Sequence, residues 1–469
     1  MAFNPDHMDQ LDFIDRFGNQ RNTYVWKYGQ WRGGSGGTTF TNQRGQTRNS
    51  TLWHYDDRKI KVRDNQFGLF FEDDIKWDLG ENKGTLNIRP GIRWDYDSLM
   101  SKHTFAPRFF TNYDFAWGKT SPNWATGVSF GLNRYYGRNM YAYALEDGVY
   151  KTRTDIRRTG PEVKPEDVLA EGRECTDSKD WNNCVVKYQS ETKFDKLKIP
   201  YDDEFTVGFT QQLKAFKLTG QYIRRNGRDQ VTKTRSDYLG RPVLNGYDDV
   251  YYVFTNDGRS KSDIIKLKLE NEKPLVWGKT KNTFGLALDW TNTKRNKADY
   301  SATLSTADLQ DDYILWDGKA IRWSERPADN FVKPYTVKLT THHEIDALGG
   351  KWFLNNLFNF KAGYHTSARK YDAANRRYET VAGKDYGIDQ PTLDVYSVVK
   401  LPSTFQWDMR LGAEYAVYKK NKLFFNIDVM NVLNKRNTVL ASLQARTGDL
   451  TPTYGIGRQF WFELGYKYY

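Results

Sequence analysis

The sequence lacks any long hydrophobic run. None of its segments approaches the roughly 18 consecutive apolar residues that a membrane-spanning helix needs, and hydrophobic residues are only 38% of the 469 residues. A helical membrane protein is therefore excluded. Disorder is also disfavoured, because disordered chains are poor in aromatic residues, whereas Trp, Tyr and Phe make up 16% of this chain.

Cysteine is scarce as well. The two cysteines, Cys175 and Cys184, lie in one polar stretch, and a zinc site would need more ligands at a recognisable spacing. Their proximity favours a short disulfide, which fits an oxidising compartment outside the cytoplasm. Two unpaired loop thiols are the alternative.

The first ten residues lack the features of a secretion signal. They contain neither a basic region nor an apolar one, so the sequence predicts no signal peptide in this chain. For a protein outside the cytoplasm, this indicates a mature chain, a truncated one or the product of a gene fragment.

Motifs for nucleic-acid binding and for catalysis are missing too. The formal net charge is +12, but the basic residues are spread along the chain and mixed with acidic ones. We therefore expect a solvated set of charges and no nucleic-acid partner. No nucleophile lies in a recognisable arrangement with a base, so we predict neither an enzyme nor a bound cofactor.

What the sequence does have is alternation with a period of two. From about residue 66 onward, apolar residues alternate with polar ones, which indicates strands with two different faces. One such run places Ile88, Ile92 and Trp94 on one face and Arg89 and Arg93 on the other. About thirteen segments of this kind follow one another, each about as long as the 9–11 residues of a tilted transmembrane strand.

The connections between these segments form two classes. Very short links alternate with long polar ones, which run about 137–203, 225–259, 293–331, 369–402 and 435–455. Short turns on one side and long loops on the other are typical of an outer-membrane barrel. A soluble β-sandwich would also alternate, but it rarely needs such long strands or long loops on one side only.

The sequence therefore predicts an all-β protein, a transmembrane antiparallel β-barrel with long extracellular loops. Aromatic residues near strand ends fit the girdles at the two membrane interfaces; they include Trp77, Trp94, Tyr96, Trp117, Trp124 and Trp290. In lipid an open sheet edge leaves backbone groups unsatisfied, so the sheet must close, usually with an even number of strands. We divide the chain into a loop-rich segment, 1–65, which holds one or two possible strands and supplies what the barrel lacks, and a barrel, 66–469.

Five segments in the expected order resemble TonB-dependent outer-membrane receptors. Three of them, 67–74, 90–95 and 105–109, resemble consecutive barrel strands of that family. Residues 427–436 look like the penultimate strand, and 454–469 look like the closing strand with its C-terminal aromatic residue. The resemblance covers most of 66–469.

The resemblance implies a fold, a set of partners and a location. Family barrels have 22 strands around a plug, and this chain would supply about 13–16 of them, because its first clear strand falls near the tenth. The expected partners are outer-membrane lipid, the barrel assembly machinery through the C-terminal strand, a small iron-chelate ligand, and the TonB–ExbB–ExbD system if a plug is supplied. The expected location is the outer membrane of a Gram-negative bacterium. No plug and no TonB-contact motif are recognisable in this sequence.

A Tyr- and Arg-rich stretch lies where one strand enters the longest loop. By the resemblance this mouth of the barrel contributes to ligand capture, and we predict that it binds a ferric siderophore or haem through Tyr135, Tyr136, Arg138, Tyr141 and Tyr143. Aromatic rings and guanidinium groups suit bulky aromatic or anionic ligands. The alternative is an interface girdle with ordinary loop packing.

The histidines offer no metal site. The rings of the adjacent His342 and His343 would point to opposite faces of a strand, so they cannot share a metal ion. His365 near a long loop could ligate haem, but a lone histidine is more often a polar surface residue.

The charged residues on the polar faces are expected to line the lumen. They include Asp95, Asp408, Glu463, Arg89, Arg93, Arg108 and Arg410. Contact with a plug is one interpretation, and ordinary cross-strand ion pairs are the one we favour.

The main functional hypothesis is therefore a truncated TonB-dependent receptor that takes up an iron chelate. A plugless passive pore and a non-functional receptor fragment are the alternatives.

Overall fold

The computed structural model describes residues 63–468, except 138–142, 146, 148–152, 158–162, 177–181, 188–189, 246, 297–302, 305–310, 327–333, 373, 376, 419 and 444–449. Of residues 1–62 it describes seven short strands. None of the described helices is long and apolar enough to cross a membrane.

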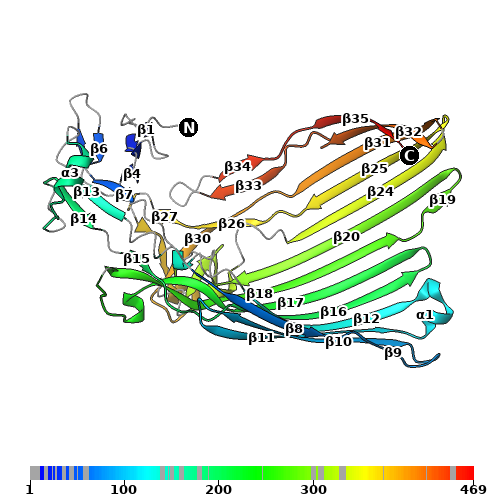
Figure 1. Cartoon of the computed structure of the whole chain (residues 1–469), viewed down its shortest axis with the longest axis horizontal. Coiled ribbons are helices and arrows are strands. Elements are labelled where there is room, and N and C mark those ends of the chain that lie inside the picture. Colours follow the sequence, from blue (N-terminus) through cyan, green and yellow to red (C-terminus); the bar gives the residue numbers. More distant parts are fainter. Residues whose placement is uncertain are drawn as a thin grey trace.

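A single curved antiparallel sheet forms a barrel wall (Figure 1). Its spanning strands are β8 (Gln66–Glu72) with β9 (Ile75–Asp78), β10 (Thr85–Asp97), β11 (Lys102–Asp114), β12 (Thr126–Tyr136), β16 (Tyr201–Leu213), β17 (Phe216–Arg235), β18 (Tyr247–Asn271), β20 (Thr280–Arg295), β24 (Tyr335–Ala347), β25 (Gly350–Lys361), β31 (Thr404–Tyr418), β32 (Asn421–Met430) and β35 (Gln459–Lys467). With β8 and β9 counted as one broken strand, the described wall has thirteen spanning strands. This confirms the predicted fold class.

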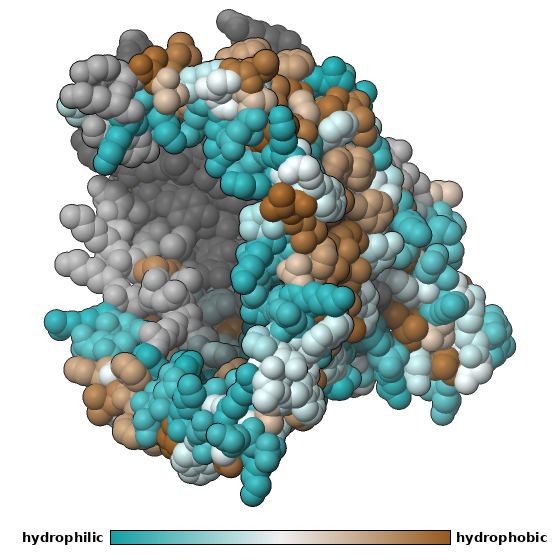
Figure 2. All heavy atoms as spheres, turned by 90° about the vertical axis from the view of Figure 1, so that its right-hand side faces the viewer, coloured by the Kyte–Doolittle hydropathy of each residue, from teal (hydrophilic) through white to brown (hydrophobic). Residues whose placement is uncertain are grey.

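The alternation in the sequence assigns each side chain of the wall to one of two faces. The outward face carries apolar side chains that are exposed although they are hydrophobic, among them Leu132 (47% exposed), Phe209 (41%) and Leu286 (42%). Such a band of exposed apolar residues is costly in water and favourable in lipid. Figure 2 shows a hollow bordered by hydrophilic side chains, with hydrophobic side chains farther out.

The end strands of the ladder have one neighbour each in the described pairings. β8 and β9 both pair with β10, and β35 pairs with β32. Because thirteen antiparallel strands alternate in direction, β8 and β35 run the same way, toward the side of the short turns. The described register contains no ladder between these two strands.

Short turns close the hairpins at one end of the wall. Between β24 and β25, Leu348 and Gly349 both have positive φ, 53° and 76°, as a two-residue hairpin turn requires. The other end carries the long connections 137–200, 236–246, 296–334, 362–403 and 431–458. In outer-membrane barrels the short turns are periplasmic and the long loops extracellular, and we use these names for the two ends.

The predicted polar connection 225–259 is wrong in its extent. Strands β17 and β18 continue beyond the other wall strands and leave only 236–246 between them. The ends of these strands were predicted as a loop because they are polar in composition. In addition, register shifts near Gln230 and Thr232 interrupt the alternation of polar and apolar residues. The extension carries Val231 and Phe254, which are buried under a neighbouring loop.

Smaller sheets are formed by strands of the long connections at the extracellular end. One contains β22 (Tyr313–Trp316), β23 (Lys319–Arg322), β26 (His365–Arg369), β29 (Thr380–Ala382) and β30 (Thr392–Lys400), and others contain β27 (Tyr371–Asp372) with β28 (Arg377–Tyr378) and β33 (Thr438–Leu443) with β34 (Leu450–Tyr454). Three short strands join the wall: β15 (Ser190–Lys193), β19 (Leu275–Trp277) and β21 (Thr303–Leu304). The helices with described bounds include α1 (Trp117–Thr120) and α3 (Pro165–Glu171), with 3-10 turns η1 (Pro122–Trp124), η2 (Asp237–Leu239), η3 (Trp323–Glu325) and η4 (Gly383–Tyr386).

The N-terminal strands pair away from the wall. They are β1 (Leu11–Ile14), β2 (Gln20–Thr23), β3 (Val25–Trp26), β4 (Gly29–Gly33), β5 (Thr39–Thr41), β6 (Thr47–Asn49) and β7 (Thr51–Tyr55). In one sheet, β3, β4 and β7 join β13 (Arg153–Arg157) and β14 (Cys184–Lys187) of the longest loop. In the described pairings no strand of 1–65 adds to the barrel wall, which differs from our expectation for that segment. The boundary at residue 65 stays a prediction.

Candidate ligand-binding mouth of the barrel

The predicted pair Tyr135 and Tyr136 is divided between the two faces of β12. Alternation along β12 places Val128 and Leu132 on the lipid side, so Tyr136 points outward and Tyr135 points into the lumen. Adjacent residues of a strand cannot grip one ligand from the same face. Of the two, Tyr135 is therefore the one placed to meet a ligand inside the barrel.

Tyr135 lies in a charged patch of the lumen wall. Its side chain is 39% exposed, and the Arg108 guanidinium lies 5.6 Å from the ring centre. On the neighbouring strands, the Arg225 Nε donates to Glu204 Oε2 at 2.5 Å. The Arg108 Nε is buried and has no hydrogen-bond partner. An aromatic ring beside a guanidinium with spare donors can accept a planar or anionic ligand.

Tyr136 belongs to an aromatic and ionic cluster on the outer side of the wall. Its ring lies 5.6 Å from that of Tyr201. The Arg134 guanidinium covers the same Tyr201 ring at 4.3 Å and donates two hydrogen bonds to Asp203, at 2.6 and 3.0 Å. Such a set of rings and charges at the end of the apolar band fits a membrane-interface anchor. Tyr136 also packs, partly buried, against the apolar group that contains Met100 and Phe254.

Tyr143 is used in packing. A buried apolar group at the extracellular end, here called the extracellular cluster, consists of Met100, Leu197, Ile199, Val231 and Phe254. Tyr143 packs edge-on against Phe254, with ring centres 4.9 Å apart. This contact ties the loop that follows β12 to the long extension of β18. Arg138 and Tyr141 lie outside the described residues.

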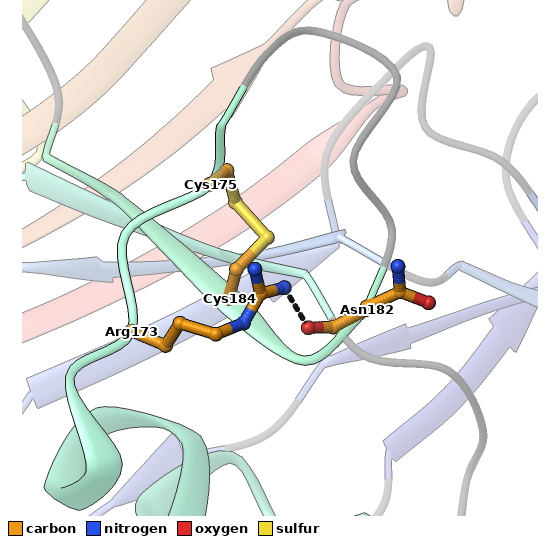
Figure 3. Close-up of a disulfide and its surroundings, with 4 residues drawn as sticks. All are labelled: Arg173, Cys175, Asn182 and Cys184. Atoms are coloured by element: carbon orange, nitrogen blue, oxygen red, sulfur yellow. Dashed lines mark hydrogen bonds between the residues drawn. A yellow bond between two sulfur atoms is a disulfide. The ribbon is translucent and has the colours of Figure 1, made fainter.

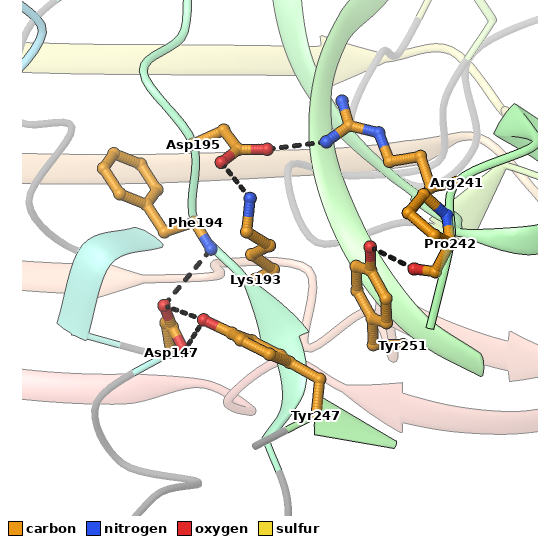
Figure 4. A network of polar contacts seen from close by, with 8 residues as sticks. All are labelled: Asp147, Lys193, Phe194, Asp195, Arg241, Pro242, Tyr247 and Tyr251. Carbon is orange, nitrogen blue, oxygen red and sulfur yellow. Dashed lines mark hydrogen bonds and ion pairs between the residues drawn. The ribbon is translucent and has the colours of Figure 1, made fainter. Parts of the chain in front are cut away.

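A polar network also holds this loop (Figure 4). The Asp147 carboxylate accepts hydrogen bonds from the Tyr247 hydroxyl at 3.2 Å and from the Phe194 amide at 3.4 Å. Asp195 pairs with Lys193 and with Arg241. Burial alone would raise the pKa of Asp195, but the hydrogen bonds from Lys193 and Arg241 outweigh it and hold the pKa below its usual value. The network therefore ties the connection 137–200 to Arg241 and Tyr247, at the connection between β17 and β18.

Cys175 and Cys184 are joined in a disulfide (Figure 3). The bond closes a short loop beyond α3, next to an apolar group of Ile156, Val168 and Val185. Backbone hydrogen bonds between Val185 and Arg173, at 2.8 Å, and between Cys175 and Val185, at 3.0 Å, align the two segments. The disulfide thus stabilises the longest loop and lies apart from the lumen residues.

A cavity on the lumen face lies closer to the periplasmic end than Tyr135, along β20, β24, β25, β31 and β32. It has a volume of about 470 Å³ and is lined by His342, Asn355, Arg410 and Asp428 among others. His342 contacts Asn355 and Glu344, whereas the neighbouring His343 contacts Asn282 and Thr341. The two rings therefore occupy opposite faces, as the alternation predicts.

Some of the carboxylates and arginines that were expected to line the lumen form ion pairs or hydrogen bonds. Arg93 binds Asp95 two residues along the same strand, with a shortest distance of 2.7 Å. Arg410 binds Asp428 across the β31–β32 ladder. Asp408 accepts from Gln406 and from a backbone amide. In the described ranges no three His, Cys, Asp or Glu side chains cluster as metal ligands would.

Sequence reasoning missed Glu204, Arg225 and the partners of the extracellular cluster. Glu204 and Arg225 could have been found by extending the face assignment of β12 across the next two strands. Phe254 and Val231 could not, because only the folded loop buries them.

Comparisons with known proteins agree with the barrel fold. No family model matches the chain. The uncharacterized protein YddB of Escherichia coli K12 is 24% identical over 432 residues, which cover 91% of this chain and 46% of YddB. The solved structure of YddB, an outer-membrane transporter, aligns with a TM-score of 0.66 and 22% identity over 93% of this chain and 49% of that one.

A more distant similarity connects the chain with the FrpB iron transporter from Neisseria meningitidis. The TM-score is 0.45 and the identity 12%, over 92% of this chain and 46% of that one. This chain thus spans about half the length of the proteins it matches. Its wall of long antiparallel strands, with an apolar outside and a polar inside, has the fold of the TonB-dependent outer-membrane receptor barrels that its strand sequences resemble.

Proposed function

We propose that this barrel is part of an outer-membrane receptor that imports a small ligand, and that the ligand is an iron chelate such as a siderophore or haem. The similarity in fold to the outer-membrane transporter YddB supports a role in transport. The observation that carries the choice of ligand is the lumen patch at the mouth, where Tyr135 faces inward beside Arg108. A ring and a guanidinium together suit an aromatic, anionic chelate.

Import through such a barrel needs an energy source and a gate. The family resemblance of the strand sequences supports coupling to the TonB–ExbB–ExbD system through a plug inside the lumen. It also supports recognition of β35 and of the aromatic residues that follow it in the sequence by the barrel assembly machinery. We propose both partnerships for the receptor of which this chain forms part of the barrel.

The test is uptake in the native host. We expect deletion of the coding region for residues 66–469 to abolish uptake of one labelled ferric chelate from a panel of siderophores and haem. A protonophore should abolish the same uptake in the parent strain. Unchanged uptake of every chelate in the panel would contradict the proposal.

A passive pore is the second candidate, and the polar lumen face supports it. A passive pore needs a wall that closes on itself. The described pairings join β8 and β9 to β10 and join β35 to β32, and none of them joins β8 to β35. This argues against a pore. The purified chain in planar bilayers separates the two functions. Steady conductance without added ligand favours the pore, and its absence, together with protonophore-sensitive uptake in cells, favours the receptor.

A further inference from the structure

Two adjacent cross-strand rows of the lumen wall are rich in lysine. Inward positions follow directly from the register. One row reads Thr219, Lys268, Ala287, Lys338, Asn359 and Gln406, and the next reads Gln221, Lys266, Asp289, Thr336, Lys361 and Thr404. Together they hold four lysines and one carboxylate. We call Lys266, Lys268, Lys338 and Lys361 the lysine band.

The faces of these positions are set by their neighbours. Leu267 and Leu286 belong to the exposed apolar band, at 39% and 42% exposure, so Lys266 and Lys268 point to the opposite side. On β24 and β25 the apolar Val337 and Phe360 stand opposite each other, which places Lys338 and Lys361 inward. The band therefore faces the lumen and not lipid.

The centre of the band is a small residue between two cations. Ala287 is directly opposite Lys268 on one side and Lys338 on the other. Strands lie about 4.8 Å apart, so the two lysine stems start about 10 Å apart across the wall. An alanine methyl group fills little of this space, and two flexible lysine side chains can reach a common anion above it.

Few acidic groups neutralise the band. In the described part of the chain, Lys268 pairs with Glu270 at 2.7 Å, and Asp289 stands opposite Lys266 in the register. Other charges on the lumen face are already committed, Lys217 to Glu272, Glu344 to Lys351 and Asp408 to Gln406. Like charges gathered on one face of the wall repel one another, so packing of the wall gives no reason for this arrangement.

We propose that the lysine band is a binding site for a small multivalent oxyanion, with carboxylate or phosphate groups, inside the barrel. Lys268 and Lys338 bind the anion from both sides of Ala287, and Lys266 and Lys361 add positive potential from the adjacent row. Lysine serves as a point charge for such groups. The site deepens the proposed function, because it makes the imported ligand a polyanion, yet anion binding can be measured without transport.

The first experiment measures binding of citrate and of tripolyphosphate to the purified full chain in detergent micelles by titration calorimetry. A triple variant, Lys266→Gln, Lys268→Gln and Lys338→Gln, should weaken binding at least tenfold. The matched control removes the same charge from exposed lysines outside the wall, with Lys83→Gln, Lys273→Gln and Lys319→Gln. It should change the affinity less than twofold.

A second pair of variants protects the test against simple misfolding. Ala287→Glu places a carboxylate between Lys268 and Lys338, where cross-strand ion pairs should keep the wall stable while competing with the anion. Ala287→Gln has the same size without the charge. We expect loss of binding for the first and near-normal binding for the second, with circular dichroism unchanged in both.

The outcomes separate this inference from the proposed function. Anion binding that depends on the band, without uptake of any chelate in cells, supports the site and contradicts only the iron-import proposal. Equal weakening by the two lysine triples would overturn the site, because net charge alone would then explain it. If the unaltered chain binds neither anion, the proposed anion site is overturned as well. That result includes the case where acidic side chains of a polypeptide in the lumen occupy the lysine band.

Discussion

The barrel wall and the extracellular cluster are built on different principles. The wall has two exposed faces, one for lipid and one for water, and its cohesion comes from the backbone ladder between long strands. The extracellular cluster resembles the core of a small soluble protein, with Met100 and Phe254 at 0% and 1% exposure. The difference shows that one chain can be stabilised both by a backbone ladder and by a buried apolar core. Strands β17 and β18 run from the first region into the second.

The largest expected effect concerns the extracellular cluster. Phe254→Ala should destabilise the local unit by roughly 3–5 kcal/mol, because the buried ring leaves a cavity. The connection 137–200 should then be cleaved much faster by an added protease, while the strand signal in circular dichroism stays the same. The control is Phe209→Ala on the outer face, where the ring is 41% exposed. If the connection 137–200 resists the protease equally well in both variants, the extracellular cluster does not hold this loop.

The next effect tests the two faces of the wall. Leu339 points outward, opposite Leu286 and Phe358, and its neighbour Thr340 points inward. Leu339→Arg should cost about 2–4 kcal/mol in lipid vesicles, and Thr340→Arg should cost much less. Denaturant unfolding of the two variants measures the difference. Similar costs at both positions would contradict the assignment of faces.

A smaller effect is expected for the disulfide. Replacing both cysteines by serine removes a constraint on a loop of about ten residues, worth roughly 2–3 kcal/mol in a chain-entropy model. Hydrogen exchange at the Val185 amide, which donates to Arg173, should become faster, while exchange in the wall strands stays unchanged. No change at Val185 would mean that the apolar group alone orders this loop.

The smallest effect is electrostatic. Asp195 has a lowered pKa in the folded chain, so its ion pairs stabilise the loop above the usual carboxyl pKa, and this contribution is lost as the pH falls toward the lowered value. Exposed ion pairs are typically worth less than about 1 kcal/mol. Proteolysis of the loop by an acid protease should therefore quicken slightly below pH 4. In Asp195→Asn this pH dependence should disappear, whereas Asp372→Asn should retain it.

The sequence predicted the wall well because the wall obeys a local rule. A strand between lipid and water must alternate, so Ile88 and Arg89 reveal their faces without any knowledge of the fold. The same rule could have separated Tyr135 from Tyr136, and it places the lysine band once the register is known. What a single strand cannot give is the register itself, which brings Lys268, Ala287 and Lys338 into one row.

The extracellular end could not be predicted in the same way. Val231 and Phe254 are buried only because Leu197 and Tyr143, distant in sequence, fold over them. No period in the local sequence announces such a contact. The small sheet around β30 escaped notice for the same reason, since β22 joins it from another loop.

Site-directed spin labelling of β18 gives the most direct test of a lipid face and a watery lumen face on one strand. A label placed in turn at each residue from 262 to 270 reports its accessibility to oxygen, which partitions into lipid, and to a water-soluble nickel chelate. We predict two oscillations with a period of two residues and opposite phase, with oxygen highest at Ile265 and Leu267 and nickel highest at Lys266 and Lys268. Oscillations in the same phase, or no oscillation, would contradict a membrane barrel.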